Sequence, residues 1–82
     1  MGRILVIEDE PDIQTLLRFN LEKEGHQVVV AGNGETGLHE LRRQAFDLVL
    51  LDLMLPDRDG LEICKVMRSK ETLSAIPIIM VT

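Results

Sequence analysis

Residues 4–10 read ILVIEDE, four aliphatic residues followed directly by three acidic ones. A short continuous apolar run, rich in β-branched residues, is typical of a strand that is buried on both faces. Such strands occur mainly in parallel sheets that helices cover on both sides. The acids then mark the carboxyl end of the strand, and at this edge open α/β sheets bind their ligands.

Apolar runs alternate with helical patterns along the rest of the chain. Further strands are predicted at residues 28–31, 48–51 and 76–81. Helices are predicted from Pro11 to a cap at Gly25, after the turn at 32–34, and after the loop at 54–59. The apolar positions expected to face the sheet are Ile13, Leu16, Leu17 and Leu21 in the first helix, Leu38, Leu41 and Ala45 in the second, and Leu61, Cys64 and Met67 in the third.

This order, βαβαβαβ, predicts an open α/β sheet with right-handed crossovers. The first helix should then lie on one face of the sheet, and the second and third helices on the other. At 82 residues the chain has room for one domain, spanning residues 1–82.

Composition excludes several classes of protein. The formal net charge of −5 argues against direct binding to nucleic acid or to an anionic membrane, because phosphate groups attract basic surfaces. The single cysteine, Cys64, cannot form an internal disulfide, so a cytoplasmic location is expected. No apolar run reaches the length of about 18 to 20 residues that a membrane-spanning helix needs.

Three carboxylates are expected to meet at one edge of the sheet. Glu8 and Asp9 follow the first strand, and Asp52 follows the third. If these strands are neighbours, Asp9 and Asp52 face the same crevice, and their like charges call for a cation between them. Magnesium suits one or two carboxylates together with a main-chain oxygen and a phosphate. Asp52 is then placed to attack a phosphoryl group as a carboxylate nucleophile.

Together these motifs resemble the receiver domain of bacterial two-component response regulators, closest to the transcription-factor branch. The motifs that carry the resemblance are residues 4–10, residues 48–55 around Asp52, Pro56 and Asp57 with Gly60, and residues 77–82. The resemblance implies a flavodoxin-like, doubly wound parallel sheet with the strand order 2-1-3-4. It also implies a sensor histidine kinase as the partner, Mg²⁺ as the cofactor, and a phospho-acceptor rather than an enzyme.

The resemblance assigns roles to five residues. It implies that Asp52 is the phospho-acceptor and, with Asp9, binds the metal, that Glu8 contacts the metal through water, and that the backbone carbonyl of Met54 is a further ligand. Thr82 is implied to be the switch hydroxyl, which hydrogen-bonds the phosphoryl group.

A complete receiver continues with a helix, a fifth strand that carries a lysine, and a last helix. The chain is therefore expected to be a receiver that is truncated after its fourth strand and impaired in signalling. The first helix alone would have to cover four strands, so an exposed apolar patch and an unpaired sheet edge are expected to favour a homo-oligomer. As an alternative, the chain is a non-catalytic, half-fold fragment whose function is to self-associate as an assembly unit.

Two other classes of protein fit less well. Residues 32–37, GNGETG, match a dinucleotide-binding fingerprint, but Asp52 follows it more closely than the expected spacing of about 20 residues. A phosphatase-like hydrolase with Asp52 as nucleophile would resemble D-x-D, and Met54 occupies the second acidic position. Asp57 and Asp59 are expected to shape their loop and to cap the third helix.

Overall fold

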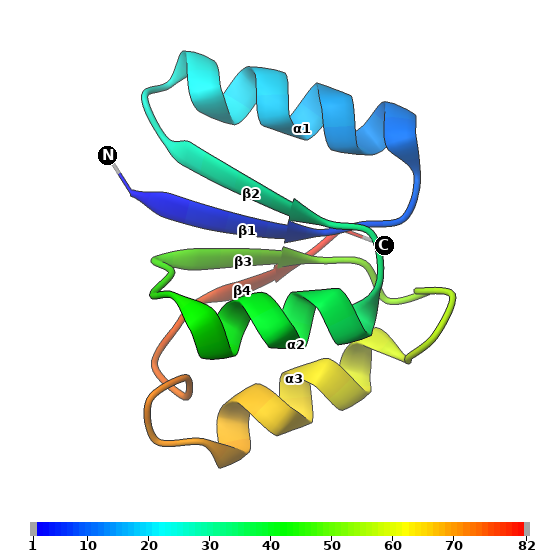
Figure 1. Cartoon of the computed structure of the whole chain (residues 1–82), viewed down its shortest axis with the longest axis vertical. Coiled ribbons are helices and arrows are strands. Elements are labelled where there is room, and N and C mark those ends of the chain that lie inside the picture. The colour runs from blue at the N-terminus through cyan, green and yellow to red at the C-terminus, as the bar shows by residue number, and fades with distance from the viewer. Residues whose placement is uncertain (1, 82) are drawn as a thin grey trace.

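The computed structural model describes residues 2–81 as one parallel sheet between two layers of helices (Figure 1). The predicted doubly wound fold is confirmed, because the strand order is β2-β1-β3-β4 and every pairing is parallel. The strands are β1 (Arg3–Ile7), β2 (Gln27–Ala31), β3 (Leu48–Leu51) and β4 (Ile78–Met80). The helices are α1 (Pro11–Lys23), α2 (Gly34–Arg43) and α3 (Gly60–Ser69).

Local sequence signals set the helix ends. Pro11 occupies the first turn of α1, where its missing N–H costs no helical hydrogen bond. Beyond the other end of α1, Gly25 adopts a φ of 90°, a left-handed conformation that suits glycine. The side chain of Asn33 caps α2 by accepting a 2.8 Å hydrogen bond from the Thr36 N–H.

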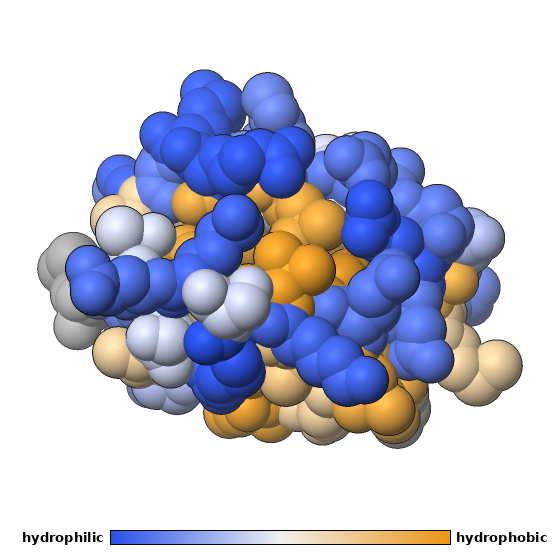
Figure 2. Space-filling model, turned by 90° about the horizontal axis from the view of Figure 1, so that it is seen from below, coloured by the Kyte–Doolittle hydropathy of each residue, from blue (hydrophilic) through white to orange (hydrophobic). Residues whose placement is uncertain are grey.

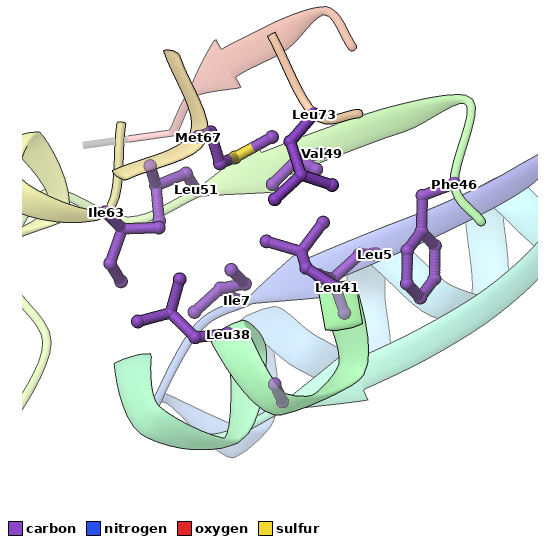
Figure 3. Packing of buried hydrophobic residues seen from close by; sticks show 11 residues of the cluster. Leu5, Ile7, Leu38, Leu41, Phe46, Val49, Leu51, Ile63, Met67 and Leu73 are labelled. Carbon is purple, nitrogen blue, oxygen red and sulfur yellow. The ribbon is translucent and has the colours of Figure 1, made fainter. Parts of the chain in front are cut away.

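The main core lies between the sheet and the α2–α3 layer (Figure 3). Inward-facing residues of β1 and β3 meet the buried sides of both helices there. Full burial of each large aliphatic side chain contributes about 1.5–3 kcal/mol. The labelled members of this cluster are Leu5, Ile7, Leu38, Leu41, Phe46, Val49, Leu51, Ile63, Met67 and Leu73.

Among residues 2–81, α1 is the one helix that covers the opposite face of the sheet, as predicted (Figure 1). Leu17 and Leu21 of α1 pack against a smaller cluster that includes Val6 and Leu50. Leu16 and Phe19, on other sides of α1, are 60% and 64% exposed. Leu16 was expected to face the sheet, so that prediction is wrong: the face of α1 that meets the strands is narrow.

The prediction of an exposed apolar patch is confirmed for β4 but wrong for β3. Within the described part of the chain, β4 is an edge strand whose one pairing partner is β3, and its Ile79 is 51% exposed. Met80, on the opposite face of the strand, is also exposed. In β3, by contrast, Leu50 is buried, because the cluster under α1 reaches it.

Two further expectations about packing are corrected. In α3, Met67 is buried and Cys64 packs partly buried against the main core, as predicted, whereas Leu61 is 53% exposed. Ile63, one turn before Met67, is the buried residue that the prediction missed. Ala45 lies beyond the end of α2 and is exposed.

Viewed from below, the side on which α3 lies in Figure 1, hydrophobic side chains are visible among hydrophilic ones (Figure 2).

Candidate metal and phosphoryl site

Parallel pairing brings the acidic ends of β1 and β3 together. In the β1–β3 register, Ile7 lies opposite Leu51. The ladder continues one step further, where the Asp52 N–H donates a 3.0 Å hydrogen bond to the Ile7 carbonyl. On the other side of β1, the Glu8 N–H donates a 3.0 Å hydrogen bond to the carbonyl of Ala31 in β2. The backbone therefore fixes Glu8 and Asp52 beside each other.

Glu8, Asp9 and Asp52 form what we call the acidic cluster. Each residue offers one carboxylate oxygen, and the three oxygens lie within 4.8 Å of one another. Glu8 is 1% and Asp52 7% exposed, whereas Asp9 is exposed. The cluster thus combines two buried carboxylates with one that opens to solvent.

Hydrogen bonding within the acidic cluster is incomplete. Glu8 Oε2 accepts a 3.0 Å hydrogen bond from the Glu10 N–H, but the buried Glu8 Oε1 has no partner among the described residues. Asp52 Oδ1 accepts a 3.0 Å hydrogen bond from the Met54 N–H. A buried carboxylate oxygen without a partner is costly, and a bound cation would remove that cost.

Burial is the main cause that raises the pKa of Glu8 above its ordinary value. The negative charges of Asp52 and Asp9 raise this pKa further, while the hydrogen bond from the Glu10 backbone opposes them. In the absence of a cation, the acidic cluster therefore disfavours full ionisation.

The donor set fits a hard divalent cation. Its members are carboxylates, and among residues 2–81 no histidine or cysteine belongs to the cluster. Oxygen ligands of this kind are those that Mg²⁺ prefers. The backbone of Met54 lies next to Asp52, to which its N–H is bonded, while the Met54 side chain is exposed. Thr82, the predicted switch hydroxyl, lies outside the described residues.

Close backbone packing supports the Asp52 side of the cluster. The Gly60 N–H donates a 2.8 Å hydrogen bond to the Leu53 carbonyl. The start of α3 therefore contacts the backbone of the residue that follows Asp52. A Cβ atom on Gly60 would lie 2.7 Å from the Leu53 Cα. Glycine is needed here because of this close approach, a role that the position of Gly60 at the start of the third helix did not reveal.

The cap expected from Asp57 is found on a different helix. Asp59 caps α3, as predicted, by accepting a 2.9 Å hydrogen bond from the Leu61 N–H. Asp57 instead accepts hydrogen bonds from the Gly34 and Glu35 N–H groups at the start of α2. No local sequence signal reveals this contact, because it joins the loop after β3 to the start of a helix more than 20 residues earlier in the chain.

The same contact bears on the glycine-rich string at residues 32–37. A dinucleotide site would use the free N–H groups at the start of the following helix to bind phosphate. In this structure the Asp57 carboxylate occupies two of those groups, and a second anion would be repelled. The dinucleotide alternative therefore has no free anion site at α2.

Comparison with known proteins gives a consistent family. The model of the response regulator receiver domain matches residues 4–82. The chain is 44% identical over 80 residues to the alkaline phosphatase synthesis transcriptional regulatory protein PhoP of Bacillus subtilis, covering 98% of this chain and 32% of that protein. It is 45% identical over 82 residues to the transcriptional regulatory protein AfsQ1 of Streptomyces coelicolor, covering 100% of this chain and 35% of that protein. The chain thus spans about a third of the length of these curated relatives.

Solved structures agree with the sequence relatives. The N-terminal domain of a response regulator receiver protein from Methanoculleus marisnigri superposes with a TM-score of 0.94 at 34% identity, covering 100% of this chain and 67% of that one. The receiver domain of a sensor histidine kinase from Pseudomonas aeruginosa superposes with a TM-score of 0.93 at 32% identity, covering 99% and 66%. That structure is described with a magnesium ion coordinated in its active-site cleft. Among the described residues of our chain, no helix is long and apolar enough to cross a membrane.

Proposed function

The chain belongs to the response regulator receiver domain family, and from this premise we propose that it accepts a phosphoryl group on Asp52 from a sensor histidine kinase. The observation that carries the proposal is the acidic cluster, in which Asp52 lies within 4.8 Å of Glu8 and Asp9. Membership of the receiver family supports a role as a signalling phospho-acceptor. The relatives are transcription regulators, so we assign the domain as the input unit of such a regulator. We place the phosphoryl transfer from the donor kinase to this domain in the cytoplasm.

The two oxygens of Asp52 have different environments, which suggests how the transfer proceeds. Oδ1 is held by the Met54 N–H. Oδ2 accepts no backbone N–H among the described residues and is the oxygen we assign as nucleophile. It attacks the phosphorus of a phosphohistidine, forming a P–O bond as the P–N bond breaks. The electron pair leaves with the imidazole, which is protonated from solvent, and an acyl phosphate remains on Asp52.

Glu8, Asp9 and Asp52, with the Met54 backbone carbonyl, would hold Mg²⁺. Bound there, Mg²⁺ supplies positive charge that offsets the charge on the transferring phosphoryl group. The orphaned Glu8 Oε1 gives this assignment a physical reason, because a cation or its water would satisfy that oxygen. Thr82 is assigned to hydrogen-bond the phosphoryl group.

Phosphorylation by a small-molecule donor tests the proposal directly. The protein is incubated with acetyl phosphate and Mg²⁺, and intact mass spectrometry detects the addition of one phosphoryl group. We expect addition to the wild type and none to Asp52→Asn. Asp12→Asn, which removes an exposed carboxylate in the first turn of α1, is the matched control and should behave as the wild type. Equal phosphorylation of Asp52→Asn would reject Asp52 as the acceptor.

A second candidate function, self-association as an assembly unit, is favoured by one observation. The edge strand β4 pairs on one side only and exposes Ile79 and Met80. An unpaired edge with apolar side chains favours contact with another copy of the chain. This candidate does not require phosphorylation, so oligomer formation that is unaffected by Asp52→Asn and by Mg²⁺ would support it.

A further inference from the structure

Asp57 links the loop after β3 to the start of α2. Its Oδ1 accepts a 2.7 Å hydrogen bond from the Gly34 N–H, and its Oδ2 accepts a 2.9 Å bond from the Glu35 N–H. Both N–H groups belong to the first turn of α2, where they have no partner within the helix. The carboxylate also carries the charge that the positive end of a helix favours.

Arg58 strengthens the same link. Its guanidinium forms an ion pair with Glu35 of α2 at 2.9 Å and a longer one with Glu62 of α3 at 3.4 Å. The backbones also come close: a Cβ atom on Gly34 would lie 3.0 Å from the Arg58 Cβ. Residues 57 and 58 therefore hold their loop against α2, and we call these contacts the α2 tether.

The loop that carries the α2 tether is short and closed at its base. Met54 and Asp59 pair as an isolated antiparallel bridge, and the Gly60 N–H bonds the Leu53 carbonyl at 2.8 Å. Met54, at the start of the loop, also donates its N–H to Asp52 Oδ1 at 3.0 Å. Asp57 lies between the two partners of this bridge, so its contacts with α2 connect that helix to the backbone that holds the Asp52 carboxylate.

We propose that Asp57 is a positioning residue of the acidic cluster: by fastening the loop to α2, it fixes the Met54 backbone against Asp52 and so sets the affinity of the cluster for Mg²⁺. This inference rests on the metal site of the proposed function. Asp57 itself is not a member of the acidic cluster. It acts through the loop, as residues behind metal ligands do when they orient them.

A charged carboxylate suits this role better than a neutral side chain. The N–H groups of Gly34 and Glu35 lower the pKa of Asp57 below its ordinary value, so the carboxylate remains ionised near neutral pH. Two acceptor oxygens bind two N–H groups at once. Asparagine has one acceptor oxygen and can keep one of these bonds, whereas alanine keeps neither.

The test compares wild type, Asp57→Asn, Asp57→Ala and the control Glu71→Gln. Glu71 is exposed, and its side chain has no hydrogen bond or ion pair among the described residues, so Glu71→Gln changes the charge equally without touching a loop contact. Mg²⁺ is titrated into each protein while NMR follows the backbone amides of Leu53 and Met54. The same amides are compared before Mg²⁺ is added, which reports loop position without metal.

We expect Asp57→Ala to weaken Mg²⁺ binding about tenfold, the lower end for loss of a group that orients a metal ligand. Asp57→Asn should fall between Asp57→Ala and wild type, and Glu71→Gln should match the wild type. The metal-free shifts of Leu53 and Met54 should follow the same order. Loss of stability alone would leave the affinity of the folded molecules unchanged, and if Asp57→Ala does not fold, Asp57→Asn carries the test.

Two results would overturn the inference in distinguishable ways. If the wild type binds Mg²⁺ saturably and both Asp57 variants bind it equally well, Asp57 has no positioning role and the proposed function stands. If the wild type shows no saturable shift, the metal site of the proposed function fails, and this inference fails with it.

Discussion

The backbone N–H of Asp52 donates a 3.0 Å hydrogen bond to the carbonyl of Ile7. This bond continues the parallel ladder one residue past the strands and holds Glu8 and Asp52 side by side, where both are buried. The sheet therefore forces together two groups whose charges repel each other. This repulsion between two buried carboxylates is what a bound cation would relieve. It also has measurable consequences for the metal-free protein.

Glu8→Gln should stabilise the metal-free protein near neutral pH. Burial raises the pKa of Glu8, so ionised Glu8 is less favourable in the folded than in the unfolded state, and the penalty grows as pH rises through the folded-state pKa. Below the ordinary value of 4.5, Glu8 is protonated in both states, and the gain from Glu8→Gln should vanish. Urea unfolding followed by circular dichroism at both pH values measures this, with Glu71→Gln as the control. A gain that does not depend on pH would show that the ionisation of buried Glu8 is not its cause.

Gly60→Ala should destabilise the protein by about 1–3 kcal/mol, the usual cost of overpacking. The new methyl group would meet the backbone of Leu53, which cannot move without moving Asp52. Gly32→Ala is the matched control, because its Cβ would contact only the Gln14 side chain, at 3.7 Å. Urea unfolding should place Gly32→Ala close to the wild type, and equal effects of the two substitutions would contradict the close approach at Gly60.

The sequence predicts the sheet well because its strands are continuous apolar runs, and the two central runs each stop at an acidic residue. ILVI stops at Glu8, and LVLL stops at Asp52. Given the strand order that the receiver resemblance implies, these strand ends are neighbours, so the carboxylates of Glu8, Asp9 and Asp52 are predicted to meet, as they do in the structure. The strand predicted at residues 76–81 is shorter, Ile78–Met80, although single backbone hydrogen bonds to β3 continue at Pro77 and Val81.

Other features depend on tertiary contacts that no local pattern encodes. In α3, Leu61 and Ile63 are equally apolar, and only the orientation of the helix on the sheet makes Ile63 the buried residue. Asp57 has the sequence signature of a loop acid, yet its partners are Gly34 and Glu35 in the first turn of α2. Such contacts are decided by how α2 and the loop after β3 approach each other.

Ile63→Ala should cost about 2–5 kcal/mol, the usual range for removing a large buried aliphatic side chain. Ile63 is fully buried between α3 and the sheet (Figure 3). Leu61→Ala, on the exposed side of the same helix, should change stability by no more than about 0.5 kcal/mol. Urea unfolding of both variants checks the corrected face of α3, and a larger cost for Leu61→Ala would reverse that correction.

Ile79→Lys should weaken any self-association through β4. A lysine on an exposed edge strand discourages pairing with a second copy. Because Ile79 is half exposed, the substitution should leave the fold intact, which circular dichroism can verify. Sedimentation equilibrium over a range of concentrations compares it with Glu71→Gln as the control. A wild type that is monomeric at every concentration would reject the assembly function.

Asp9→Asn should weaken Mg²⁺ binding far more than Glu10→Gln, although the two substitutions remove the same charge from adjacent residues. Asp9 contributes an oxygen to the acidic cluster, whereas Glu10 lies outside it and its side chain makes no cap hydrogen bond to α1. Loss of a direct ligand to a hard cation removes both a charge and a coordination position, while loss of a nearby charge changes only a screened interaction. Titration of Mg²⁺ followed by NMR measures the affinity. Mg²⁺ also stabilises the folded state by an amount that increases with the logarithm of its affinity, so thermal unfolding with and without Mg²⁺ gives a second readout. Wild type and Glu10→Gln should gain stability from Mg²⁺, and Asp9→Asn should gain little. Equal gains in all three proteins would mean that Mg²⁺ acts through general surface charge, and the acidic cluster would lose its assignment as the metal site.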